Sequence, residues 1–295
     1  MRNYLCLVCV LGLLACSGDD DAEESMTTVD ATNAMDTMNA TDAMNAPTIT
    51  PGWRHGNTLT FDGTERTYSL YAPAAEAVTG LVIALHGSGD TVEGMIDEMA
   101  AEPVADSHGF MLVVPQGLEN GWNDEDPPGH GLADDVGFID ALIVDLQTTY
   151  PSLPSHKTFA YGFSNGGGLA TRLACQSRHV RGTGVIGNYH APELCVARPT
   201  DYAIPGWFGA GVRDEQVPVS DVRSTMSSFV SDLTDCTVNG ALEPVDVADL
   251  PAGVVCKAFR GCTQARLCEY AHYEHEALPG SLLAMWTFLD GLSID

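Results

Sequence analysis

A Gly-x-Ser-x-Gly pentapeptide, Gly162-Phe163-Ser164-Asn165-Gly166, is the feature that most constrains how this 295-residue chain can fold. A strand-like run at 158–161 precedes it, and a helix-like run at 167–175 follows it. The two glycines permit a strained turn in which the strand and helix backbones pack closely. The pattern therefore predicts a serine raised above the end of a buried strand, where the free N–H groups of a helix N-terminus favour negative charge.

Strand and helix patterns alternate along the rest of the chain. The apolar run at 81–85 is typical of a buried strand, and 134–150 has the spacing of an amphipathic helix. Alternating runs around Asp62-Gly63 predict a hairpin. Further strands are expected at 110–114, 203–208, 254–259 and 267–270, and further helices at 93–101, 221–233 and 282–292. This order predicts an α/β fold with a doubly wound, mostly parallel sheet in a single domain over 53–295.

The N-terminus has the pattern of an export signal followed by a spacer. An apolar run at 4–15 is too short to span a bilayer, which takes about 20 residues, so residues 1–15 are expected to be a signal peptide. Leu13-Leu14-Ala15-Cys16 resembles a bacterial lipobox, which implies lipidation of Cys16 and an outer-membrane or cell-surface lipoprotein. Ordinary signal cleavage with release outside the cell is the alternative. The polar, acidic stretch at 16–52 is expected to be a disordered linker.

The chain is strongly acidic, with a net charge of −27. Eight of its 40 acidic residues fall in 17–50, so the folded part is acidic as well. Binding to phosphates requires Lys and Arg, so nucleic acid is not expected as a partner. Anionic membranes are disfavoured for the same reason, which leaves the lipid anchor as the expected membrane contact.

Six cysteines remain after the predicted signal and anchor. An even number in an exported protein suggests three disulfides, although six cysteines allow 15 pairings. A metal site is the alternative, because some of them lie near His272 and His275. Their spacing lacks the C-x2-C knuckle of zinc modules, so no metal or other cofactor is expected. The six residues are Cys175, Cys195, Cys236, Cys256, Cys262 and Cys268.

A serine hydroxyl is a weak nucleophile and needs a base that an acid holds in place. Asp214 lies just beyond a predicted strand and is the expected acid, with Glu215 as a close competitor. His275 lies in a loop before the last predicted helix and is the expected base, with His272 as the alternative. The expected catalytic residues are therefore Ser164, Asp214 and His275.

An oxyanion hole is expected from two backbone N–H groups. One belongs to Asn165, directly after the serine, and the other to Ser88, in the glycine-rich loop after the 81–85 strand. Two aromatic residues are expected at the substrate site. His86 follows that strand and serves there as an orienting or packing residue, and Trp122 either stacks on a substrate ring or anchors the core.

Eight motifs occur in the same order as in a known family. Together they resemble the secreted polyhydroxybutyrate depolymerases and feruloyl or acetylxylan esterases over about residues 57–292. The motifs are Asp62-Gly63 with Arg66 and Tyr68, Leu85-His86-Gly87, His108-Gly109-Phe110, Pro115-Gln116-Gly117, Trp122-Asn123, Asp134-Asp135-Val136-Gly137-Phe138, Gly162 to Gly167, and Asp214 with Val217-Pro218.

The resemblance implies an α/β-hydrolase fold and a serine esterase with Ser164, Asp214 and His275 in the triad positions. It also implies a Cys175–Cys195 disulfide, and leaves the other four cysteines unassigned. The implied substrates are polyhydroxybutyrate-type oligomers or feruloyl and acetyl esters of polysaccharides. A non-catalytic surface lipoprotein that binds esters or glycans on the same fold is the alternative, and the oligomeric state stays open.

Overall fold

The computed structural model describes residues 49–124, 133–188, 195, 202–248 and 250–292. The chain divides into two units, Met1–Met44 and Asn45–Asp295, and every described residue belongs to the second. The predicted signal peptide, the predicted lipidation site at Cys16 and the linker up to residue 48 lie outside the described residues. Ile49 already packs against the core, so the folded part includes residues before the expected start at 53.

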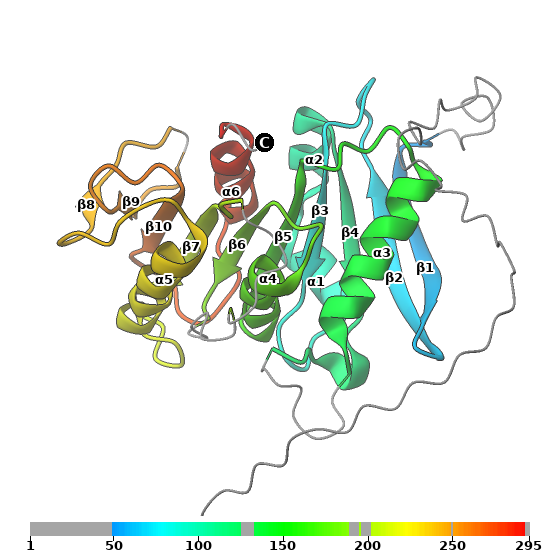
Figure 1. Cartoon of the computed structure of the whole chain (residues 1–295), viewed down its shortest axis with the longest axis horizontal. Helices are drawn as coiled ribbons and strands as arrows, with labels where there is room; N and C mark the ends of the chain where they lie inside the picture. The colour runs from blue at the N-terminus through cyan, green and yellow to red at the C-terminus, as the bar shows by residue number, and fades with distance from the viewer. Residues whose placement is uncertain (1–48, 125–132, 189–194, 196–201, 249, 293–295) are drawn as a thin grey trace, which may run out of the picture. The chain divides into compact units, whose positions relative to one another are not determined.

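The described residues form a ten-stranded sheet in the order β1-β2-β4-β3-β5-β6-β7-β10-β9-β8 (Figure 1). The six central strands, from β4 to β10 in that order, run parallel, and antiparallel strands extend the sheet at both edges. The strands are β1 (Gly52–Phe61), β2 (Thr64–Ala72), β3 (Gly80–Leu85), β4 (Phe110–Pro115), β5 (Thr158–Phe163), β6 (Gly182–Ile186), β7 (Gly206–Gly211), β8 (Glu243–Pro244), β9 (Val254–Ala258) and β10 (Ala265–Tyr270).

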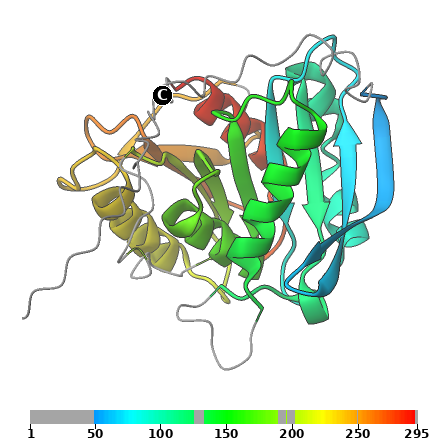
Figure 2. The same ribbon diagram turned by 45° about the vertical axis from the view of Figure 1, so that its right-hand side comes forward.

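Helices cover both faces of the sheet, as Figures 1 and 2 show. One apolar cluster joins the sheet to α3 (Asp135–Thr149), α4 (Asn165–Gln176) and α5 (Val219–Leu233). A second cluster on the other face joins it to α1 (Val92–Met99), α2 (Glu102–His108) and α6 (Ser281–Asp290). A short 3-10 turn, η1 (Leu118–Asn120), follows β4. None of the helices in the described part of the chain has the length and apolar character needed to cross a membrane.

The doubly wound, mostly parallel sheet expected from the sequence is confirmed. Every residue of β3 and β4 is buried, as their continuous apolar runs predict. The expected hairpin is also present, with Asp62 and Gly63 both at positive φ in the turn between β1 and β2.

Several elements differ from the sequence-based expectation. The strand expected at 203–208 lies at Gly206–Gly211, and α2, β6 and β8 had not been predicted. In β6 the missing signal has a structural cause, because Gly182 and Gly184 replace the large apolar residues of an ordinary buried strand. A Cβ at Gly184 would lie 2.5 Å from the Met285 sulfur, so the glycine lets α6 approach the sheet.

All six cysteines of the folded part form disulfides. Cys175 pairs with Cys195, as the family resemblance implies. The remaining pairs are Cys236–Cys262 and Cys256–Cys268. Cys256 and Cys268 face each other in the register of β9 and β10, so the sheet itself brings the two sulfurs together. The expectation of three disulfides is therefore confirmed.

A buried ion pair connects the antiparallel edge of the sheet to the start of α3. An Arg66 Nη atom on β2 lies 2.8 Å from Asp135 Oδ1, and each side chain is only 2% exposed. The guanidinium also lies over the Phe138 ring, 3.9 Å from its centroid. The other carboxylate oxygen of Asp135 accepts a hydrogen bond from the Asn123 backbone N–H at 2.7 Å. This pair therefore fixes helix α3, strand β2 and the segment before α3 together.

Asp135→Asn should destabilise the folded state strongly, because it leaves the Arg66 cation buried without its counter-charge. Removal of one member of a buried pair costs about 3–5 kcal/mol. Urea unfolding followed by circular dichroism measures the change. Glu243→Gln, in the exposed Arg260–Glu243 pair, is the matched control and should leave the midpoint where it is. Equal midpoints for the two variants would contradict this assignment.

Candidate active site

The Gly-x-Ser-x-Gly sequence forms a sharp turn between β5 and α4. Ser164 has φ 52° and ψ −120°, a strained conformation for a residue with a side chain. A Cβ at Gly162 would lie 2.1 Å from the Gly166 carbonyl oxygen, and one at Gly166 would lie 2.2 Å from the Leu85 oxygen. Glycine is therefore required at both positions, and the turn raises Ser164 above the carboxyl end of β5 as expected.

Ser164, His275 and Asp214 form one chain of hydrogen bonds. The Ser164 hydroxyl lies 2.9 Å from His275 Nε2, and His275 Nδ1 lies 2.7 Å from Asp214 Oδ2. The second oxygen of Asp214 accepts from the backbone N–H groups of Gln216 at 2.9 Å and Val217 at 2.7 Å. Each carboxylate oxygen thus has its own partner, which fixes the plane of the group and the orientation of the imidazole.

The structure places the alternative residues that the sequence left open outside this chain of hydrogen bonds. Asp214 follows β7 and is buried, whereas the neighbouring Glu215 is exposed and lines a polar pocket. His275 lies in the loop between β10 and α6 and reaches Ser164, whereas His272 is exposed and lies near Gly253. Of these four residues, His275 and Asp214 are the two that are hydrogen-bonded to each other, and His275 also to Ser164.

The two residues expected to form an oxyanion hole both lie in segments next to Ser164. Asn165 is the first residue of α4, and Ser88 lies in the loop after β3. Within the described residues, the backbone N–H of neither residue donates to a protein acceptor. A Cβ at Gly87 would lie 3.7 Å from Ser164 Cβ, so the Ser88 loop passes directly beside the nucleophile.

His86 and Trp122 are both buried, so His86 is the packing residue that the sequence suggested, and neither side chain lines the polar pocket of His275 and Asp214. The His86 Nδ1–H donates to the Gly87 carbonyl at 2.8 Å, and its Nε2 accepts from the Gly117 N–H at 3.0 Å. Trp122 is 6% exposed and donates through Nε1 to the His86 carbonyl at 2.9 Å. Both residues therefore connect loops to one another. Of the two roles expected for Trp122, the structure agrees with that of a core anchor.

Three further residues support the site and were not recognised in the sequence. The Asn188 amide donates to the Ser164 carbonyl at 3.0 Å, and the Phe163 ring packs on the His275 ring at 4.9 Å. Gly187 has φ +55°, and a Cβ there would lie 3.2 Å from the His275 ring. Phe163 belongs to the pentapeptide, but Gly187 and Asn188 follow an unpredicted strand, so no sequence signal placed them here.

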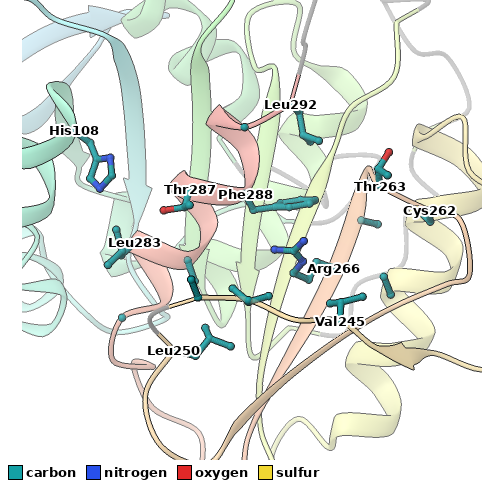
Figure 3. Close-up of a pocket in the computed structure, with 17 residues that line it drawn as sticks. His108, Val245, Leu250, Cys262, Thr263, Arg266, Leu283, Thr287, Phe288 and Leu292 are labelled. Carbon is teal, nitrogen blue, oxygen red and sulfur yellow. The ribbon is translucent and has the colours of Figure 1, made fainter.

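A polar pocket of about 740 Å³ lies beside the triad. His275 and Asp214 line it, together with three exposed carboxylates and one arginine. A larger and more apolar cavity of about 770 Å³ lies between α6 and the residues Val245, Val247, Ala248 and Leu250, around Arg266 (Figure 3). None of the triad residues lines that larger cavity. The residues that charge the first pocket are Arg213, Glu215, Glu274 and Glu276.

Among the described residues, no group of three or more His, Cys, Asp and Glu side chains is arranged to hold a metal ion. The three cysteines near His272 and His275 are all used in disulfides. The hydrogen-bonded serine, histidine and aspartate, with two N–H groups nearby, form a set of groups that can activate a hydroxyl nucleophile and stabilise an oxyanion.

The chain has the α/β-hydrolase fold. A solved structure of an acetyl xylan esterase from Aspergillus awamori superposes with a TM-score of 0.63 at 13% identity, over 79% of this chain and 98% of that one. This likeness defines the fold, and the fold expected from the sequence is confirmed.

Relatives named as esterases support the expected resemblance. Feruloyl esterase D of Neurospora crassa is 28% identical over 213 residues, which are 66% of this chain and 69% of that protein. An esterase-named protein of Nocardia uniformis subsp. tsuyamanensis, NocK, is 33% identical over 121 residues, 39% of this chain and 35% of that protein. No family model matches the chain. The resemblance to feruloyl esterases is thus confirmed, whereas that to polyhydroxybutyrate depolymerases stays a prediction.

Asp214→Asn should slow the labelling of Ser164 by a fluorophosphonate probe by about 10³- to 10⁴-fold, because His275 loses the carboxylate that holds its tautomer. Glu215→Gln is the matched control and should label at the wild-type rate. Labelling rates followed by intact-protein mass spectrometry test both variants. A slow Glu215→Gln and a normal Asp214→Asn would transfer the acid's role to Glu215.

The stability of the fold should depend on the protonation of His86. Burial lowers the pKa of His86 below its ordinary value of 6.5, and the Gly87 hydrogen bond and the charges of Asp90 and Asp135 oppose this only in part. A folded-state pKa below the unfolded one stabilises the fold above about pH 6.5, and this contribution is lost as the pH falls through the folded pKa. We expect the free energy of unfolding to fall from pH 7.5 to pH 5.

His86→Asn cannot take up a proton and should flatten that pH dependence, measured by urea unfolding at several pH values. His272→Asn, at an exposed histidine, should keep the wild-type slope. An unchanged slope in His86→Asn would show that His86 does not contribute to the pH dependence.

Proposed function

We propose that this protein is a carboxylic ester hydrolase that works through an acyl-enzyme on Ser164. The observation that carries the proposal is the chain of hydrogen bonds Ser164–His275–Asp214, with separations of 2.9 and 2.7 Å, at the carboxyl ends of the parallel strands. The α/β-hydrolase fold and the esterase names of the sequence relatives support the same class of reaction.

In the proposed mechanism, His275 Nε2 takes the hydroxyl proton of Ser164 as Oγ attacks the ester carbonyl carbon. Asp214 keeps Nδ1 protonated and stabilises the imidazolium that forms. The backbone N–H groups of Ser88 and Asn165 bind the tetrahedral oxyanion. His275 then gives its proton to the leaving alcohol. Water, deprotonated in turn by His275, hydrolyses the acyl-enzyme, which releases the carboxylic acid and restores Ser164.

We propose neutral esters as the substrates, in the feruloyl, acetyl or hydroxybutyrate class. Three exposed carboxylates, on Glu215, Glu274 and Glu276, surround His275, with Arg213 as the cation lining the same pocket. Their potential opposes the approach of anionic polymers. Because Trp122 is buried, a ring of the substrate has to pack on some other group.

We further propose that the enzyme is exported and anchored through a lipid on Cys16. The three disulfides support an oxidising compartment, where such bonds persist. The lipobox-like Leu13-Leu14-Ala15-Cys16 supports the anchor.

Ser164→Ala should abolish the hydrolysis of p-nitrophenyl acetate, p-nitrophenyl butyrate and methyl ferulate, because no other group carries the acyl intermediate. Ser231→Ala, at an exposed serine of α5, is the matched control and should hydrolyse all three at the wild-type rate. Release of p-nitrophenol or ferulate measures the rates.

Wild-type activity in Ser164→Ala would overturn the proposal. A wild-type protein that binds these esters without hydrolysing them would instead support the non-catalytic binding function. Transfer of the acyl group to an added alcohol, with no acid released, would identify an acyltransferase.

A further inference from the structure

We propose that Trp122 is a positioning residue that sets the relative placement of the two oxyanion N–H groups. This inference rests on the proposed function and concerns a side chain that does not line the polar pocket of His275 and Asp214. Trp122 is buried, and its backbone and its indole hydrogen-bond to the two segments that carry the Asn165 and Ser88 N–H groups.

The backbone of Trp122 holds the Asn165 side. Its N–H donates to Asn165 Oδ1 at 2.7 Å, and its carbonyl accepts from Asn165 Nδ2 at 3.0 Å. The Asn165 side chain therefore makes a closed pair of hydrogen bonds with a single residue. Because Asn165 begins α4 directly after Ser164, these bonds restrain the first turn of the helix, which carries the Asn165 backbone N–H.

The indole of Trp122 holds the Ser88 side. Nε1–H donates to the His86 carbonyl at 2.9 Å, and the ring packs on the His86 ring at 4.9 Å. On the other side of Ser88, the Gly89 N–H donates to the Asn120 carbonyl at 2.6 Å. Ser88 thus lies between two residues, His86 and Gly89, that are each held by a hydrogen bond. Their partners, Trp122 and Asn120, both belong to the short segment 120–122.

Hydrogen bonds with buried side chains attach the 120–123 segment to the core. The next residue, Asn123, donates its backbone N–H to Asp135 Oδ2 at 2.7 Å. Its carbonyl accepts from Arg172, a buried arginine on α4, at 2.9 Å. Asp135 is itself fixed by Arg66. Trp122 is therefore attached to the core through charge-assisted hydrogen bonds, which are the stronger class.

This arrangement matters because an oxyanion hole acts through preorganised donors at about 2.7–3.1 Å from the developing charge. A misplacement of about 1 Å in such a site can cost about 100-fold in rate. Loss of the indole N–H would let the Ser88 loop relax while the Asn165 side stays in place. The transition state would lose stabilisation that the bound substrate does not use, so kcat should fall while KM stays near its value.

The test is Trp122→Phe, which removes the indole N–H and keeps an aromatic ring. Trp53→Phe is a matched control, because Trp53 also donates Nε1–H to an oxygen, Glu102 Oε1 at 2.8 Å, and stacks on a histidine, His55. We expect kcat for p-nitrophenyl butyrate to fall about tenfold in Trp122→Phe with KM within about twofold of wild type. Trp53→Phe should keep both constants within about twofold.

A trifluoromethyl ketone provides a second readout, because Ser164 converts it to a hemiketal oxyanion in the same hole. Its inhibition constant should rise in Trp122→Phe in proportion to the fall in kcat/KM. Asn165→Ala keeps the Asn165 backbone N–H but removes both bonds to Trp122, and should show the same pattern. That variant preserves the test if Trp122→Phe does not fold.

Three outcomes would overturn the inference: a kcat in both variants within twofold of wild type, equal losses in Trp122→Phe and Trp53→Phe, or a raised KM with unchanged kcat. The last outcome would make Trp122 a substrate contact. Each is distinct from a failure of the proposed function, in which Ser164→Ala itself retains hydrolysis.

Discussion

The structure depends on a carboxylate that is enclosed where water cannot reach it. Asp135 can be buried because Arg66 forms an ion pair with one of its oxygens and a backbone N–H donates a hydrogen bond to the other. Satisfying those bonds requires β2, the start of α3 and the segment before α3 to lie in one arrangement. That N–H belongs to Asn123, and the residue directly before it, Trp122, is the one bonded to Asn165. The buried Asp135 carboxylate thus helps to position the turn that carries Ser164, through the consecutive residues Trp122 and Asn123.

The sheet assembles the rest of the site. Ser164, Asp214 and the loop that carries His275 follow β5, β7 and β10, which belong to one parallel set. Because parallel strands bring their carboxyl ends to one edge, residues separated by 111 positions, Ser164 and His275, come within hydrogen-bond distance. The glycines of the pentapeptide then decide how close the backbone of α4 comes to β3.

The sequence allowed the framework of the fold and of the site to be predicted, because both rest on local patterns. The apolar runs of β3 and β4 and the period of α3 indicate their environment directly. The chain order of Ser164, Asp214 and His275 follows from strands that alternate with helices. What could not be predicted depends on distant partners. Only the folded structure shows that Asp214 and His275, and not Glu215 and His272, join the hydrogen bonds that reach Ser164.

The roles of His86 and Trp122 illustrate the same limit. Both are aromatic residues expected near a nucleophile. That pattern indicates a substrate contact as well as it indicates a packing residue. Their burial follows from hydrogen bonds with distant partners. Gly117 donates to His86 across 31 positions of sequence, and Trp122 donates to His86 across 36. The pairing of Cys256 with Cys268 likewise follows from the register of β9 and β10, which no count of cysteines contains.

The acidic rim beside His275 has a consequence for the end of the catalytic cycle. In the proposed reaction an ester arrives without charge and an acid leaves as an anion. The carboxylates of this rim therefore act differently on the two. They have little electrostatic effect on the neutral ester, and they repel the newly formed carboxylate of the product; the rim residues are Glu215, Glu274 and Glu276. The surroundings of the site favour product departure over rebinding, and since these carboxylates are exposed, added salt would weaken that preference.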